Sequence, residues 1–181
     1  TNLTEVNNIH VSKLTNSDQK PFGTKDTKLT TLRFGEGATV VPWNFANGVT
    51  SLTTVELPST VTKLDGYCFY NTGIASINLP KSVTTLGRNC LSKTKLTEIT
   101  IRGNAAAAST DYPPFANCSL LTSMTFVDGV TKVGYGIANG CTTLTEINIA
   151  DTVTSIDGYA MCNTGIASLT IPKKVTSLGN Y

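Results

Sequence analysis

A hydrophobic pattern that recurs along most of the chain restricts most strongly what this sequence can fold into. The pattern is L-x-x-L-x-L, in which Ile, Val, Met or Phe can replace Leu. Its copies begin at Leu29, Leu52, Ile74, Leu96, Leu121, Leu144 and Ile166. A degenerate first copy begins at Leu3. Such a near-constant period is the signature of a protein built from stacked repeats.

A second motif, P-x-x-V-x-x-L, follows several of these segments at a fixed distance. It begins at Pro58, Pro80 and Pro172, and it recurs without the proline at Val130 and Val153. One unit of this size cannot bury its own apolar face, so stability must come from contacts between neighbouring units. We expect each L-x-L segment to form a short strand that pairs in parallel with the next. The V-x-x-L segment favours an extended or 3₁₀-like turn on the opposite wall, and short helical or 3₁₀ turns are expected at 66–72, 88–93 and 158–163.

These patterns predict a single domain over residues 1–181, an α/β-type but β-rich leucine-rich-repeat solenoid. The expected shape is a right-handed superhelix or horseshoe with a parallel β-sheet on its concave face. The sequence accommodates roughly eight repeats, each in the size range of leucine-rich repeats. The first and fifth repeats are irregular and the last is truncated, which suggests a fragment of a longer protein. In the fifth repeat, residues 102–114 replace the P-x-x-V-x-x-L motif, and we expect an irregular loop there.

The repeat unit resembles the BspA-like leucine-rich repeats. The segment from Leu52 to Phe69, L-T-T-V-E-L-P-S-T-V-T-K-L-D-G-Y-C-F, comes close to that pattern, and the resemblance covers roughly residues 29–179. It implies a location at the surface of anaerobic bacteria or parasitic protists. It also implies roles in adhesion to host proteins or cells.

Composition excludes several classes of function. The chain has 14 basic and 12 acidic residues, and Lys173-Lys174 is its only pair of adjacent cations, so a nucleic-acid-binding patch is not expected. No apolar run approaches the ~18 residues that a membrane-spanning helix needs, and no targeting segment is visible at the start. Threonine is the most abundant residue type; it replaces much of the usual charge and favours β structure.

The residues that most often carry chemistry do not form a recognisable motif. Cys68 and Cys90 occupy the same repeat position, which favours buried free thiols, although disulfides joining Cys68 to Cys90 or Cys118 to Cys141 remain an alternative. The sequence has no C-x-x-C motif and therefore predicts no zinc site. His10, the only histidine, is expected to be exposed. We predict no cofactor, no metal and no enzymatic activity.

The outward-facing strand positions form the candidate binding surface on the concave face. They are Thr31, Arg33, Thr54, Glu56, Ser76, Asn78, Glu98, Thr100, Ser123, Thr125, Glu146, Asn148, Ser168 and Thr170. Small polar residues dominate this set, and Arg33 alone is of a type enriched at binding hot spots. Trp43, Tyr70 and Tyr112 lie off this face. We expect Trp43 to be partly packed, and the alternative is that it serves as an exposed anchor in the Pro42-Trp43-Asn44 turn.

The sequence thus predicts a non-catalytic module of a cell-surface or secreted protein that binds a macromolecule. The expected partner is a host or extracellular protein, or a glycan, and the expected activity is adhesion. The alternative is a structural spacer or assembly segment that presents another domain.

Overall fold

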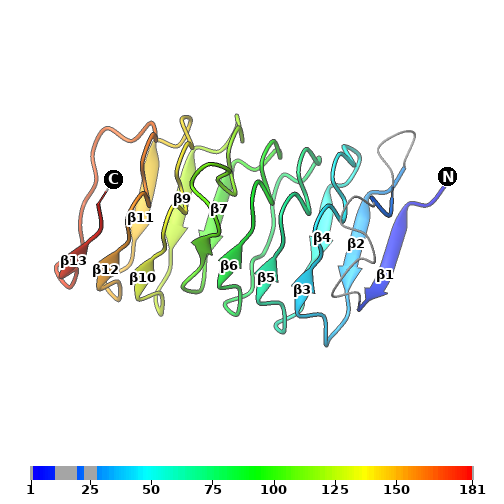
Figure 1. The fold of residues 1–181 in the computed structure, drawn as a ribbon, viewed down its shortest axis with the longest axis horizontal. Coiled ribbons are helices and arrows are strands. Elements are labelled where there is room, and N and C mark those ends of the chain that lie inside the picture. The colour runs from blue at the N-terminus through cyan, green and yellow to red at the C-terminus, as the bar shows by residue number, and fades with distance from the viewer. Residues whose placement is uncertain (1, 11–19, 23–27, 181) are drawn as a thin grey trace.

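The computed structural model describes residues 2–10, 20–22 and 28–180. Over these residues the chain winds as a solenoid, and its parallel strands form two rows along the long axis (Figure 1). The strands are β1 (Glu5–Ile9), β2 (Thr31–Phe34), β3 (Val40–Val41), β4 (Thr54–Glu56), β5 (Lys63–Leu64), β6 (Thr85–Leu86), β7 (Glu98–Ile101), β8 (Ala106–Ala107), β9 (Ser123–Phe126), β10 (Lys132–Val133), β11 (Glu146–Ile149), β12 (Ser155–Ile156) and β13 (Ser177–Leu178). No helix occurs in these ranges, so the leucine-rich-repeat solenoid is confirmed in an all-β form.

Most L-x-L segments form the first row of strands, as predicted, but the copies that begin at Ile74 and Ile166 form no strand. β1, β2 and β4 make one parallel sheet, and β7, β9 and β11 make another. Alternate residues of each strand point inward: Leu32, its partner Val55 and, further along, Met124 are buried. Between β4 and β7, residues 75–79 form no strand, and the row is interrupted there.

The second row shows that the V-x-x-L segments are extended. β3, β5, β6 and β8 make one sheet, and β10, β12 and β13 make the other. Each strand has only two residues, and the second of the pair is buried in most of them, as at Leu64 and Leu86. The extended alternative is therefore confirmed, and the 3₁₀-like alternative is wrong, because these residues hydrogen-bond to the neighbouring repeat.

The fifth repeat keeps this second wall, which corrects the prediction of an irregular loop over the whole of 102–114. β8 pairs in register with β6, with Ala106 beside Thr85. Ala105 and Ala107 are buried. A wall position needs a free backbone N–H and an apolar side chain that fits, and alanine supplies both although the V-x-x-L motif is missing.

The turns that follow the second wall form a third hydrogen-bonded wall instead of the predicted short helices. In the turn after β5, the N–H groups of Tyr67, Phe69 and Asn71 donate to carbonyl oxygens of the next repeat at 2.7, 2.9 and 2.9 Å. Most such turns contain two residues with positive φ, four positions apart. The pairs are Asn44 and Gly48, Tyr67 and Asn71, Asn89 and Lys93, Gly136 and Gly140, and Tyr159 and Asn163. Only the alternate N–H groups, such as those of Cys68 and Tyr70, donate three residues back within the repeat, at 3.4 and 3.2 Å. The segments 66–72, 88–93 and 158–163 therefore contain single turns with 3₁₀-type bonds, and the predicted short helices do not form.

Threonine and serine hydroxyls connect neighbouring repeats, which gives the threonine-rich composition a structural role. Thr60 donates to the carbonyl of Ala38 at 2.8 Å, and Thr152 donates to that of Val130 at 2.8 Å. Both bonds span 22 residues, which is one repeat. Inside the three walls lies one continuous apolar core, in which Phe69, Phe115 and Phe126 are the largest fully buried side chains.

Candidate functional site

The outward side chains of the first row form a polar surface, which we call the strand face. Because neighbouring strands pair in parallel and in register, equivalent side chains line up along the solenoid. Thr100, Thr125 and Asn148 occupy equivalent positions on β7, β9 and β11 and form one such line. Glu98, Ser123 and Glu146 form the neighbouring line. The structure therefore brings these predicted residues together on one side of the molecule.

A charge network occupies the N-terminal end of the strand face. The Arg33 side chain donates from Nε to Oε1 of Glu56 at 2.8 Å and from one terminal nitrogen to Oδ1 of Asn7 at 3.1 Å, and it also contacts the Glu5 carboxylate. The sequence did not reveal Glu5 or Asn7, because the first repeat is degenerate. These neighbours engage Nε and one terminal nitrogen of Arg33 and neutralise its charge, which makes Arg33 a weaker candidate for a binding anchor than its residue type suggested.

A depression of about 430 Å³ lies in the middle of the strand face, where the first row of strands is interrupted. Its lining consists of Thr53, Thr54, Val55, Ser76, Ile77, Asn78, Glu98, Thr100 and Arg102. Five of these residues were predicted from the alternation of the strands. The side chains offer hydroxyl, amide, carboxylate and guanidinium groups, so the depression can both donate and accept hydrogen bonds.

Arg102 is the charged residue lining the depression that sequence reasoning missed. Its Nε donates to Oδ1 of Asn78 at 3.0 Å, which places an exposed cation at the rim. The sequence placed Arg102 at the start of an irregular loop. Arg102 follows β7 directly and continues the every-second-residue spacing of the outward-facing Glu98 and Thr100. This spacing is the signal that could have identified Arg102.

The remaining predicted residues lie towards the C-terminal end of the strand face. The Asn148 amide donates to Oε1 of Glu146 at 2.8 Å on β11. Ser168 and Thr170 are exposed but lie outside the strands, and neither lines the depression. Outward positions of the strands in the described part carry no aromatic side chain, in line with the sequence.

In the part of the chain that the structure describes, the residue types that could hold a metal ion do not cluster. Within 2–10, 20–22 and 28–180, no three His, Cys, Asp or Glu residues gather closely enough to hold a metal ion. The same ranges contain no helix long and apolar enough to span a bilayer. His10 is exposed, as predicted, and its Nε2 lies 2.9 Å from Oδ1 of Asn8.

The cysteines are free, which confirms the interpretation of repeat-locked, buried thiols. Cys68, Cys90, Cys118 and Cys141 are buried, and Cys162 is half-buried. Burial raises the pKa of the Cys68 and Cys118 thiols and raises the pKa of Cys141 to about 12, because the thiolate would lose its hydration. The Cys68 thiol donates a weak hydrogen bond to the Cys90 carbonyl at 3.7 Å.

We expect thiol reagents to distinguish these two classes of cysteine. Only the thiolate reacts, and the raised pKa of the Cys141 thiol keeps it protonated at pH 8. In a thiol-labelling assay of the folded chain at pH 8, Cys162 should react first and the four buried cysteines should react slowly. All five should react once the chain is unfolded without a reductant. Fast labelling of the buried four would contradict this packing, and fewer than five thiols after unfolding would indicate a disulfide.

Comparison with known proteins places the chain in a family. The family model for the BspA type leucine rich repeat region matches residues 20–112 and 108–181, with six copies of the repeat. The chain belongs to the BspA-type leucine-rich-repeat family. This finding agrees with the wall motifs and repeat length described above. No curated protein matches the chain.

Two solved structures show the same fold. A leucine-rich repeat protein from Bacteroides ovatus superimposes with a TM-score of 0.57 and 20% identity over 97% of this chain and 53% of that one. A T. pallidum leucine rich repeat protein gives 0.57 and 19% over 98% of this chain and 67% of that one. The chain thus spans about half the length of the Bacteroides protein, and at this level of identity the likeness concerns the fold alone.

Proposed function

We propose that this BspA-type chain is a non-catalytic binding module of a cell-surface or secreted protein, and that its strand face binds a host or extracellular protein in adhesion. The single observation that carries the proposal is the polar depression in the middle of that face. Family membership supports a repeat-protein binding module, and a solenoid suits this role because its stacked repeats present a long, continuous surface.

The chemistry of the depression favours a polar protein segment as its occupant. Small-molecule pockets are mostly apolar and enclosed, whereas this depression is open and lined largely by polar side chains such as Ser76, Asn78 and Glu98. Thr54 and Glu98 are exposed and project from strands that are hydrogen-bonded to their neighbours, so little backbone freedom is lost on binding. A protein loop that carries both donors and acceptors would satisfy these groups.

A binding screen against arrayed extracellular-matrix proteins and glycans at physiological salt tests this proposal. For a saturable hit, the double variant Asn78→Lys/Glu98→Lys should weaken binding by about tenfold or more, because it replaces a hydrogen-bonding amide and a carboxylate with two bulky cations. Thermal unfolding should change little, since both side chains are exposed.

The matched control is Asn148→Lys/Glu146→Lys. These two residues have the same side chains and lie on the same face, but outside the depression. The control should bind the hit with nearly the affinity of the unchanged chain. Equal losses of affinity in the two double variants would mean that the net charge of the chain governs binding. No loss of affinity in either variant would place the ligand outside the strand face.

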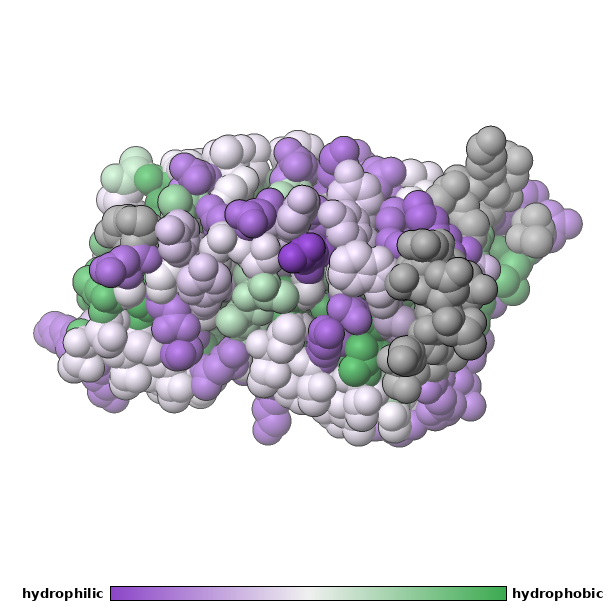
Figure 2. All heavy atoms as spheres, viewed as in Figure 1, coloured by the Kyte–Doolittle hydropathy of each residue, from purple (hydrophilic) through white to green (hydrophobic). Residues whose placement is uncertain are grey.

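A role in assembly has one specific observation in its favour. An apolar hollow of about 370 Å³ lies at the last turn of the solenoid, lined by residues that include Ile156, Met161 and Leu178. Hydrophobic side chains are visible at that end (Figure 2), and Leu178 is 64% exposed. Sedimentation velocity over a range of concentrations checks this alternative: self-association abolished by Leu178→Asn would support it, and a monomer at all concentrations would count against it.

A further inference from the structure

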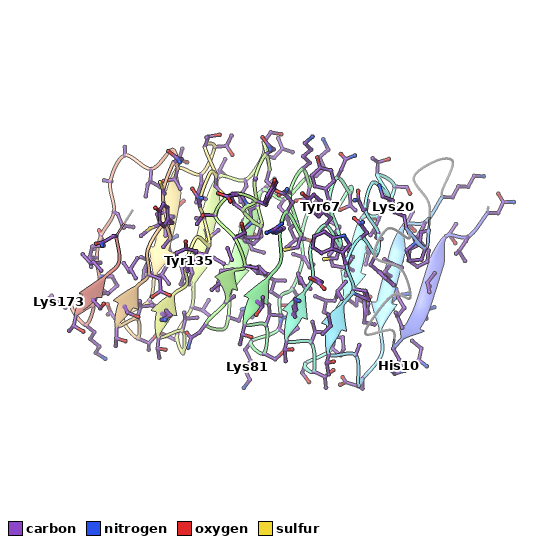
Figure 3. All side chains as sticks on the ribbon, in the orientation of Figure 1. His10, Lys20, Tyr67, Lys81, Tyr135 and Lys173 are labelled. Atoms are coloured by element: carbon purple, nitrogen blue, oxygen red, sulfur yellow. The ribbon has the colours of Figure 1, made fainter. Side chains whose placement is uncertain are left out.

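Aromatic side chains with a polar tip gather in one place that the proposed binding site does not use. In the described part, every Trp and Tyr lies in or beside the turns of the third wall. We call the contiguous part of this surface the aromatic edge, and it consists of Trp43, Tyr67, Tyr70, Arg88, Lys93 and Tyr112. Tyr67 and, farther along the solenoid, Tyr135 are labelled in Figure 3.

The rings of the aromatic edge pack against one another across repeats. Trp43 and Tyr67 have centroids 5.3 Å apart, and Tyr67 and Tyr70 have centroids 5.5 Å apart, in tilted and edge-to-face arrangements. The Trp43 ring lies on the backbone of Gly66, where even a Cβ atom would overlap it. The edge is therefore a fixed surface, and rigid Trp and Tyr side chains are typical of interface anchors.

Two cations cover the tyrosine faces in the middle of this edge. The guanidinium of Arg88 lies 5.2 Å from the centre of the Tyr112 ring, and Nζ of Lys93 lies 5.3 Å from that of Tyr70. Both cations are exposed, and within the described ranges neither forms an ion pair with a carboxylate. The nearby carboxylate of Asp65 is already paired with Lys63 at 3.2 Å. Asp111, beside Tyr112, is the one exposed carboxylate in the described part of this edge.

The backbone indicates that these side chains have a role beyond closing the turn. Tyr67 and Lys93 have φ values of 55° and 57°, a left-handed conformation that L residues other than Gly, Asn and Asp rarely adopt. Most other repeats place Asn or Gly at these two positions, as at Asn89 and Gly140, although Tyr159, with a φ of 55°, occupies the position equivalent to that of Tyr67. Strained residues of this kind cluster at functional sites, and here the strain places an aromatic ring and a cation at the surface.

We propose that the aromatic edge is a second interaction surface and that it binds an acidic peptide segment of a partner protein. Unpaired cations over tyrosine rings are complementary to carboxylates, and the tyrosine hydroxyls can donate hydrogen bonds to the same groups. A sugar would need free ring faces for stacking, and Arg88 and Lys93 each occupy one face of Tyr112 and Tyr70. This surface is distinct from the strand face, so the two proposals can fail separately.

Trp43 supplies a direct readout, because it is the only tryptophan in the chain. Its emission should be followed while the chain is titrated with a short peptide of alternating Glu and Gly. The acidic peptide should give a saturable change that weakens as salt increases. A peptide with Gln in place of Glu should bind about tenfold more weakly or not at all, and a heparin oligosaccharide should bind more weakly than the acidic peptide.

The variants Tyr67→Asn and Lys93→Asn separate binding from folding. Each places a residue that tolerates positive φ at a strained position. The Tm should rise by about 2–4 °C in Lys93→Asn, whereas in Tyr67→Asn the loss of the ring contacts with Trp43 and Tyr70 should offset the relieved strain and leave the Tm nearly unchanged. In both variants the affinity for the acidic peptide should fall severalfold. Lys95→Asn is the matched control, an exposed lysine two positions along that should leave both quantities nearly unchanged. Unchanged affinity in both strained-site variants would overturn the proposal. So would equal binding of the Gln peptide, tighter binding of heparin, or no emission change with the acidic peptide.

Discussion

Replacing Phe69 with alanine is expected to lower the free energy of unfolding by about 3–5 kcal/mol. Phe69 has no solvent exposure, and its backbone N–H also donates to the Cys90 carbonyl of the next repeat at 2.9 Å. The substitution removes the ring and leaves a cavity that the three hydrogen-bonded walls cannot collapse to fill. Urea unfolding followed by circular dichroism measures the loss.

Two further variants show whether the loss comes from packing. Phe69→Leu should cost only about 1–1.5 kcal/mol, because Leu91 already fills the equivalent position of the next repeat. Leu120→Ala, at a side chain that is 47% exposed, should cost about 0.5 kcal/mol or less. If Phe69→Ala were no more destabilising than Leu120→Ala, the core described here would be wrong.

Replacing Gly87 with alanine is expected to cost about 3 kcal/mol, the second-largest effect. A Cβ atom at Gly87 would lie 2.5 Å from the backbone nitrogen of Gly66 and 2.8 Å from the carbonyl oxygen of Leu64. These are backbone atoms of the preceding repeat, so the clash can be relieved only by moving two stacked turns apart. Differential scanning calorimetry should show a markedly lower Tm.

Gly129→Ala provides the contrast. A Cβ atom there would meet nothing within 4 Å, and the only penalty is the positive φ of 94°. Its cost should be about 1 kcal/mol. A Gly87→Ala variant as stable as Gly129→Ala would show that the repeats are not stacked as closely as the structure has them.

The two strand walls of the solenoid could be predicted well, because apolar residue types mark the buried positions directly in the sequence. Alternation within L-x-L set the inward side of β4, with Val55 buried and Glu56 exposed, and the neighbouring repeats follow the same rule. The V-x-x-L motif located the second wall. At β8, the alanines that replace it carry little hydrophobic signal, although small side chains pack well where the backbones lie close.

The turns were harder to predict, because their structure depends on bonds between repeats. The Tyr67 N–H bonds to the carbonyl of Arg88 in the next repeat, and no local propensity shows such a partner. Asn or Gly residues spaced four apart, as at Asn44 and Gly48, were the available signal for two left-handed positions. Tyr67, Lys93 and Tyr159 break that pattern. The aromatic edge also depends on ring contacts between repeats, so it could be recognised only in three dimensions.

Several residues that line the candidate site could be predicted from the sequence, but the depression that they form could not. The alternation of inward and outward residues placed Thr54, Ser76 and Asn78 on the strand face, but it placed all the other outward-facing positions there as well. Only the interruption of the first row at residues 75–79 gathers some of them around a depression. The alternation of β7 could have placed Arg102 on this face, but its bond to Asn78 joins two repeats and is visible only in the structure.

The most direct test of the binding-module proposal is an NMR titration of the isotope-labelled chain with the hit from the binding screen. We expect saturable amide shifts at Thr54, Ser76, Asn78, Glu98 and Thr100, with much smaller shifts at Thr125 and Asn148. A set of shifts confined to the turns, the second wall or the last turn of the solenoid would contradict a ligand site on the strand face, as would a screen with no saturable hit.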